Sequence, residues 1–299
     1  MIRPVAGVLL VGIAARVTAA EPGFDAEPAN HDRLELQARF GLATAPFDVM
    51  ALPEARGQAF VIVADGRIAV APRIAIELRA PLVLASVAQP AGSYVDAATS
   101  GNPQLRAIYQ LADRRGPESE LAVIGGLDLG APLAGHDATL LANRALAIAS
   151  AIDGFAHPEL FAPGSVPITP FASARWTAGP WTLAAAARLP VLVRISDADL
   201  PGAAATPRRI GFSGVALGEA RRELSRRLAL ALAPQLAIEV APGADHVRAV
   251  PRLQDLERVS LHVRLGARAR LIVDLQTAVG GALGGSTFGG GVRGLVDLP

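Results

Sequence analysis

Strict alternation between large apolar and small or polar side chains constrains the fold of this chain more than any other feature. In residues 226–240 every second position from Leu228 onward carries a large apolar side chain, apart from Pro234. The positions between them carry alanine, glutamine or glutamate. A strand places such positions on opposite faces, whereas a helix would scatter both sets around its surface. The segment therefore predicts a two-faced strand.

The same period recurs along most of the chain. Twelve segments alternate in this way: residues 34–43, 58–70, 73–84, 104–111, 118–130, 168–178, 181–195, 208–221, 226–240, 258–266, 270–279 and 286–298. Most of them reach the length of about ten residues that a tilted strand needs to cross a bilayer. The fold class indicated is all-β: an antiparallel up-and-down transmembrane β-barrel of about twelve strands.

The connections between these segments alternate in length. Short ones fall at 70–73, 113–116, 178–180, 224–227 and 266–268, and long ones at 87–101, 131–166, 196–207 and 242–255, with the tight hairpin 281–286 as an exception on the long side. Short periplasmic turns and long outer loops are typical of membrane barrels. A soluble periplasmic β-sandwich remains an alternative, because its strands would show the same alternation with the apolar face turned inward. Residues 140–152 fit a further strand, a short helix or a loop folded into the lumen, and we leave them out of the wall.

The N-terminus has the layout of a secretory signal. Arg3 precedes an apolar run, and small residues end at Ala20. We expect a signal peptide over 1–20, a flexible leader over 21–32 and the barrel over 33–299. The mature chain is then expected in the outer membrane of a Gram-negative cell.

Composition excludes several kinds of site. The chain has no cysteine, its five histidines are scattered, and its net charge is +1. These observations argue against metal sites, cofactors and a nucleic-acid partner. The nearest match to a serine-hydrolase elbow, residues 211–215, has Val215 where the second glycine belongs. We therefore expect no catalytic residues and no enzyme activity.

Charged side chains on the polar strand faces are the candidate functional residues, since those faces should line the lumen. The selectivity candidates are Arg79, Arg106, Arg188, Arg264, Arg270, Glu77, Glu239 and Asp274; Arg67, Arg175, Arg293, Glu35, Glu120 and Asp128 share the expected inward faces. Two interpretations stay open: a static network of ion pairs, or an arginine-rich constriction that selects anionic or aromatic solutes. Seven aromatic residues are expected to form girdles at the membrane surfaces: Phe60, Tyr109, Phe171, Trp176, Trp181, Phe212 and Phe288.

Several strand and turn motifs resemble a known family. They are residues 70–82 (VAPRIAIELRAPL), 101–106 (GNPQLR), 129–132 (LGAP) and 265–271 (LGARARL). These segments resemble the outer-membrane barrels named for a role in the phenol meta-cleavage degradation pathway. The resemblance covers most of residues 58–298, and it departs from outer-membrane barrels at the C-terminus, where Leu298 and Pro299 replace the usual terminal aromatic residue.

The resemblance implies a narrow channel for passive uptake of small, hydrophobic or aromatic solutes. The alternatives are a closed structural or adhesive outer-membrane barrel and a soluble periplasmic binding sandwich. Expected partners are outer-membrane lipid, a small solute and the barrel-insertion machinery. A charge at Leu275, on the expected lipid face, should be tolerated far worse than one at Gln276, on the lumen face.

Overall fold

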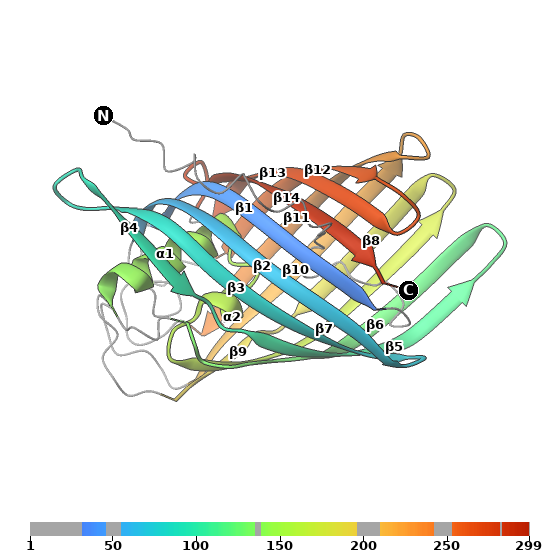
Figure 1. Ribbon diagram of the computed structural model, residues 1–299, viewed down its shortest axis with the longest axis horizontal. Helices are drawn as coiled ribbons and strands as arrows, with labels where there is room; N and C mark the ends of the chain where they lie inside the picture. Colours follow the sequence, from blue (N-terminus) through green and yellow to red (C-terminus); the bar gives the residue numbers. More distant parts are fainter. Residues whose placement is uncertain are drawn as a thin grey trace.

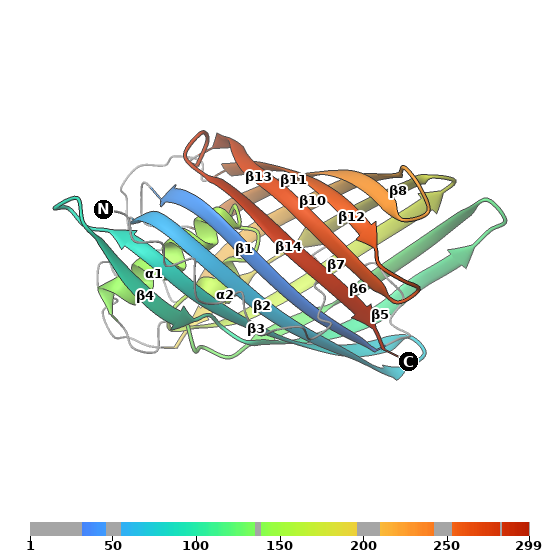
Figure 2. The same cartoon turned by 45° about the horizontal axis from the view of Figure 1, so that its top comes forward.

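The computed structural model describes residues 32–45, 55–134, 139–195, 210–241, 253–281 and 283–298. The expected signal peptide and nearly all of the leader lie outside these residues. The described chain forms a closed antiparallel barrel (Figures 1 and 2). Its strands are β1 (Arg33–Ala45), β2 (Ala55–Ala71), β3 (Ile74–Ala88), β5 (Gln104–Arg115), β6 (Ser119–Gly130), β7 (Ser165–Ala178), β8 (Trp181–Arg188), β9 (Val191–Arg194), β10 (Ile210–Glu223), β11 (Leu228–Ala241), β12 (Leu253–Arg264), β13 (Ala269–Gly281) and β14 (Phe288–Asp297).

The wall has twelve crossings, as predicted. Strands β8 and β9 count as one crossing, because both pair with β7 on one side and β10 on the other. The break between them falls at Pro190, which has no N–H to donate to a neighbouring strand. Pairing of β14 with β1, from Arg33 opposite Asp297 to Leu42 opposite Phe288, closes the barrel and leaves no free edge in the wall.

The two ends of the barrel differ as the connection lengths predicted. Turns of two to four residues join β2 to β3, β5 to β6, β7 to β8, β10 to β11 and β12 to β13, all at the end called here the short-turn end. The β3–β4 turn and the described parts of the segments between β6 and β7 and between β13 and β14 lie at the opposite, long-loop end (Figure 1). One expectation was wrong in detail: the loop predicted at 87–101 contains a strand, β4 (Tyr94–Ser100), that pairs with the outer part of β3.

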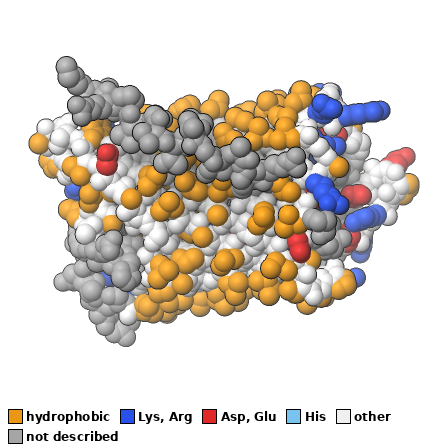
Figure 3. Space-filling view, viewed as in Figure 1, with side chains coloured by type: hydrophobic (Ala, Val, Ile, Leu, Met, Phe, Trp, Pro, Cys, Tyr) orange, Lys and Arg blue, Asp and Glu red, His pale blue; other side chains and the backbone are white. Residues whose placement is uncertain are grey.

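The faces of the wall are those of a membrane barrel. On β11 Leu230 is 46% exposed on the outside, whereas the neighbouring Ala229 is 8% exposed on the inside. Large apolar side chains are spread over the outer face that Figure 3 shows, and charged ones collect at the short-turn end. A β-sandwich would bury its apolar faces instead, so that alternative is wrong.

Two helices lie inside the lumen toward the long-loop end: α1 (Leu140–Ile152) and α2 (Pro158–Phe161) (Figure 1). Segment 140–152 is thus a helix folded into the lumen, and leaving it out of the wall was correct. It is rich in alanine, the best helix former, and Thr139 caps its start by accepting a hydrogen bond from Ala142 N at 3.1 Å. Neither described helix is long and apolar enough to cross a bilayer.

Helix α1 is buried on nearly every side. Its apolar residues, including Leu146 and Ile148, pack with inward-facing valines such as Val61 and Val83 in one apolar cluster. A helix that is apolar all round needs apolar surroundings on all sides. The inner faces of β1 to β3 supply these apolar surroundings at the long-loop end. Small residues on these faces provide space for the helix: a Cβ added to Gly41 would lie 2.9 Å from Ile152 Cγ2.

Candidate functional site: the charged lumen and its plug

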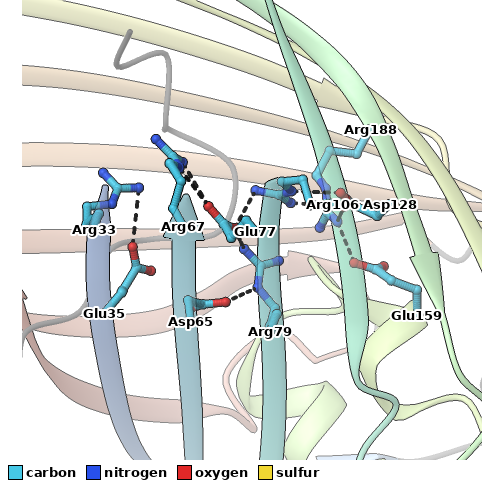
Figure 4. A network of polar contacts seen from close by, with 10 residues as sticks. All are labelled: Arg33, Glu35, Asp65, Arg67, Glu77, Arg79, Arg106, Asp128, Glu159 and Arg188. Carbon is cyan, nitrogen blue, oxygen red and sulfur yellow. Dashed lines mark hydrogen bonds and ion pairs between the residues drawn. The ribbon is translucent and has the colours of Figure 1, made fainter. Parts of the chain in front are cut away.

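Inward-facing charges of six wall strands, together with Glu159 of helix α2, form a ladder across the lumen (Figure 4). It contains five arginines and five carboxylates, all at most 4% exposed: Arg33, Arg67, Arg79, Arg106, Arg188, Glu35, Asp65, Glu77, Asp128 and Glu159. The five positive charges equal the five negative charges in number. Burial of so many ions is tolerated only because each is placed beside opposite charge, since an isolated buried ion is very costly.

Glu77 of β3 is the centre of the first half of the ladder. Its carboxylate accepts hydrogen bonds from Arg67 Nη2 at 2.8 Å and from Arg79 Nη2 at 3.1 Å. Arg79 also donates through Nε to Asp65 Oδ1 at 2.7 Å. Cross-strand pairing explains the cluster: Asp65 stands opposite Arg79, and Arg67 stands opposite Glu77.

The second half of the ladder joins the wall to helix α2. Arg106 of β5 donates through Nε and Nη2 to both oxygens of Asp128 on β6, at 2.7 and 2.9 Å. Arg188 of β8 donates through Nη2 to Asp128 at 3.0 Å and to Glu159 Oε1 at 2.5 Å. A two-fold arginine–carboxylate contact fixes orientation as well as distance. The network therefore holds α2 against the wall.

We call residues 139–164 the plug. Its second half, from Ile152 to Ala162, is held by polar side chains from widely separated strands. Gln235 of β11 donates to Asp153 O at 3.0 Å, Gln276 of β13 donates to Ile152 O at 2.5 Å, and Asn102 donates to Ala162 O at 2.8 Å. These donors satisfy main-chain carbonyls that a helix end or a loop leaves open. The segment is thereby tied both to the β11–β13 side and to the region before β5.

The C-terminus of α1 carries a buried acid–histidine pair. Asp153 Oδ2 lies 2.6 Å from His157 Nδ1, and Asp153 Oδ1 accepts from Arg39 Nη1 of β1 at 2.5 Å. Burial lowers the pKa of His157 below its usual value, aided by nearby Arg188 and opposed by Asp153. Burial opposes ionisation of Asp153, but attraction to His157 and Arg39 outweighs it and lowers the pKa of this carboxyl. A neutral imidazole then donates from Nδ1 to the carboxylate.

Gly154 sets the direction in which the chain leaves α1. Its φ is +59°, in the left-handed region that favours glycine. A Cβ at this position would lie 2.7 Å from Leu256 Cδ1 and 2.8 Å from Gln235 Nε2. The turn therefore needs glycine for its conformation and for its contact with β11 and β12.

A second cluster surrounds Asp274 of β13. Arg293 Nε lies 3.4 Å from Asp274 Oδ2, and Arg258 Nε lies 3.8 Å from Asp274 Oδ1. Arg258 also donates to Gln276 Oε1 at 3.0 Å. Gln276 thus links this cluster to the end of α1.

The selectivity candidates occupy three environments. Arg79, Arg106, Arg188 and Glu77 belong to the buried ladder, and Asp274 to the second cluster. Arg270 is partly exposed, 3.9 Å from Asp297. The side chain of Glu239 lies outside the described residues, although its backbone pairs with Ser213.

Arg264 does not lie within the lumen, contrary to the expected placement. Its side chain is 54% exposed at the short-turn end, where Nη2 lies 3.6 Å from Glu223 Oε1. The reason is a shifted boundary: β12 begins at Leu253 inside the predicted loop 242–255 and ends at Arg264. Glu120 is likewise exposed near the end of its strand, and Arg175 is half-buried.

One aromatic assignment was also wrong. Phe171 does not belong to a girdle: its ring packs with Ile108 and Ile124 inside the wall, and the Arg106 guanidinium carbon lies 4.6 Å from the ring centre. Along β7 the odd-numbered residues, such as Thr169 and Ser173, face inward. The odd number of Phe171 would therefore have indicated its inward position.

Several site residues were missed from the sequence. Their odd or even position along an alternating strand could have identified Asp65, Arg39, Gln235 and Arg258 as inward-facing. Asp153, His157 and Glu159 could not be found in this way, because they lie on the plug and no period relates them to the wall. Within the described residues, no three metal-binding side chains come together.

Comparisons with known proteins agree on the fold. The chain is similar to the crystal structure of an outer membrane channel from Pseudomonas putida F1, with a TM-score of 0.62 at 15% identity, over 93% of this chain and 100% of that one. It is also similar to the NanC porin, with a TM-score of 0.52 at 7% identity, over 88% and 100% of the two chains. No protein-family model and no curated protein matches the sequence. These likenesses establish an outer-membrane-type barrel.

Proposed function

We propose that this protein is an outer-membrane channel for small solutes, and that the plug closes it in the conformation described. The observation that carries the proposal is the polar attachment of segment 153–162. Its carbonyls and charges are bound by side chains such as Gln235, Arg188 and Asn102. Water can replace each such hydrogen bond at a modest net free energy, about 0.5–1.5 kcal/mol for a neutral one and about 1.5–3 kcal/mol where a charge takes part. Segment 153–162 can therefore exchange its contacts for water, whereas the apolar helix α1 stays packed against the wall.

The barrel would reach the outer membrane after cleavage of the signal peptide near Ala20, with the insertion machinery as a transient partner. The proposed solutes are small and aromatic or hydrophobic, as the family resemblance implies. The similar proteins named above as a channel and a porin support a transport role and not an enzymatic one.

A disulfide between the plug and the wall tests the gate. A Cβ built on Gly289 lies 3.4 Å from Ile152 Cγ2, an atom whose place a cysteine sulfur at 152 can take, and 3.0 Å from Phe40 O, which must shift slightly. The chain has no cysteine of its own, so within one molecule the double variant Ile152→Cys/Gly289→Cys can form only this bond.

The measurement is planar-bilayer conductance of the refolded double variant. We expect no channel steps in the oxidised protein and steps like those of the wild type after a thiol reductant is added. The single variant Gly289→Cys, treated identically, should conduct in both states. Equal conductance of the oxidised and reduced double variant would show that the plug is not the gate.

The second candidate function is a closed structural barrel. It is favoured by the burial of the inward-facing ladder, in which the five arginines are at most 4% exposed. A wild-type protein that inserts into the bilayer yet gives no channel steps under any condition would establish this alternative.

Ion preference tests which arginines act on solutes. Arg264 is exposed at the short-turn mouth, so Arg264→Glu should lower anion preference while the fold survives. Arg79→Glu would instead place a third carboxylate beside Asp65 and Glu77 and should prevent folding. An unchanged reversal potential in a salt gradient for Arg264→Glu would remove this residue from the conduction path.

A further inference from the structure

Two neighbouring turns at the short-turn end carry a concentration of exposed arginines. The β10–β11 and β12–β13 turns hold Arg226, Arg227 and Arg268, and Arg222 and Arg264 lie at the adjoining ends of β10 and β12; these five residues are called here the basic rim. Glu223 is the one acidic residue within 222–227 and 264–268. The turns touch directly, since Arg264 N donates to Arg227 O at 2.8 Å.

The excess of positive charge is largest in this sector, since the β2–β3 turn carries the single Arg73. The β5–β6 turn, at the same end, carries Arg114 and Arg115 together with Asp113, Glu118 and Glu120, so its charges nearly balance. The basic rim is therefore a local feature and not a general property of short turns in this barrel. Arginine and carboxylate colours gather at this end in Figure 3.

The basic rim lies where the apolar outer band ends. Leu228, the residue after Arg227, is 40% exposed on the outer face, and Leu230 follows it. Arg222 points outward and stacks on Trp181, with its guanidinium carbon 5.5 Å from the ring centre. Tryptophan and arginine at the edge of an apolar band are typical of the depth of lipid headgroups.

Apolar side chains accompany the arginines. Leu224 and Leu265, in the same two turns, are 58% and 62% exposed, and Trp181 is 44% exposed. A purely aqueous polyanion would gain nothing from them. A lipid offers both partners at once: an anionic phosphate for the guanidinium groups and acyl chains for leucine and tryptophan.

We propose that the basic rim binds the headgroups of anionic phospholipids in the leaflet next to the short turns. Arginines near a membrane surface attract anionic lipid with about 1 kcal/mol each, or roughly five-fold in binding. The proposal goes beyond transport and requires only that the barrel lies in a membrane. Lipid held here would fix the depth of the barrel and the position of the β10–β13 turns.

The two tryptophans of the chain provide the readout. Trp176 and Trp181 both lie on the outer face of β7 and β8, beside β10 of the basic rim. The protein is reconstituted in phosphatidylcholine vesicles that contain a minor fraction of phosphatidylglycerol. Bromine atoms near the headgroup end of the acyl chains are placed on one lipid or the other, and quenching of tryptophan fluorescence gives the local ratio of the two lipids.

In the wild type we expect phosphatidylglycerol to be enriched several-fold over its bulk fraction, less so at high salt. The triple variant Arg226→Gln/Arg227→Gln/Arg268→Gln should bring the ratio close to the bulk value. The matching lysine variant should retain most of the enrichment, because it keeps the charge. The control Arg114→Gln/Arg115→Gln, in the balanced turn, should behave as the wild type. Heat-modifiable gel mobility verifies that each variant is folded.

Two results would overturn the proposal. One is a wild-type lipid ratio equal to the bulk ratio at low salt. The other is displacement of bound phosphatidylglycerol by soluble, carboxylate-bearing cell-wall fragments at equal charge concentration, which would assign the basic rim to an anionic peptide. Neither result depends on conductance, so the lipid site and the channel function can fail independently.

Discussion

At the scale of single residues, position in the wall decides what a side chain tolerates. Leu275 and Gln276 are neighbours in β13, yet they are 60% and 2% exposed. The alternation predicted these opposite faces correctly. It did not predict that Gln276 binds Arg39, Arg258 and the end of α1 at once. A charge at Gln276 would therefore disturb three contacts, and this residue is no neutral site for substitution.

A better comparison for the lipid face is Ala184 of β8. It faces the lumen, is partly exposed and stands between Glu219 of β10, which attracts a new cation, and Arg175 of β7, which repels it, so the two effects oppose each other. We expect Leu275→Arg to destabilise the barrel by about 2–4 kcal/mol, because it places a charge in the apolar band, and Ala184→Arg to have little effect. The measurement is urea unfolding in vesicles. Similar losses for the two variants would mean that the faces are misassigned.

At the scale of the element, the plug combines a rigid helix with a charged joint at its end. Helix α1 packs on apolar wall residues, while Asp153, His157 and Glu159 connect the following segment to Arg39 and Arg188. The helix and the joint respond to different changes, and each can be tested alone.

Acid should release the plug through His157. The groups facing it are Asp153 at the end of α1, Arg188 of β8 and Glu159 of α2. Its pKa is lowered from the usual 6.5 in the closed state. The neutral form therefore stabilises closure above pH 6.5, and that stabilisation is lost as the pH falls below 6.5 toward the lowered pKa. We expect more channel openings as the solution is acidified through this range.

The variant His157→Gln supplies the control for acid release. Glutamine can still donate to Asp153 but does not titrate, so the pH response should become much weaker. A response of unchanged size in His157→Gln would assign the effect to other groups.

The turn after α1 gives a second test of the plug. Gly154→Ala adds a Cβ at a φ of +59° and within 2.7 Å of Leu256, which should displace the plug and raise its cleavage by trypsin. Gly179→Ala is the matched control: its φ is +53°, but a Cβ there meets no atom within 4 Å. If both variants are cleaved alike, backbone strain and not the contact with β12 explains the effect.

At the scale of the whole molecule, closure of the barrel gives every wall strand a hydrogen-bonded neighbour on both sides. Twelve antiparallel crossings closed by β1 and β14 leave the apolar band as the outer surface. Such a molecule requires lipid or detergent around it.

We therefore expect the mature protein to fractionate with outer membranes and to migrate differently on gels before and after heating. Heating unfolds the barrel, and the compact form runs at a different apparent mass. Recovery in the soluble periplasmic fraction, with a single mobility at all temperatures, would contradict a membrane barrel.

The local alternation of side chains was sufficient to determine the strands of the wall and their inner and outer faces. A period of two fixes which residues share a face, and strand length and turn spacing fix the number of crossings. For this reason all twelve segments were found, and the inward positions of Arg79, Arg106, Arg188, Glu77 and Asp274 followed from parity alone. Strand ends were less certain, since alternation fades in polar turns. Arg264 moved to the exposed rim because β12 begins earlier than its pattern suggests.

Only the tertiary structure decided what fills the barrel. The pattern of segment 140–152 fitted a strand, a helix or a lumenal loop, and its placement depends on contacts with β1, β2 and β3, far away in the sequence. The partners of Asp153 and Glu159 are Arg39 and Arg188, brought close by closure of the wall and return of the loop. Side-chain alternation is a local property of the chain and can be read from neighbours. A lumen is enclosed only when the first and last strands pair, so its contents depend on the whole fold.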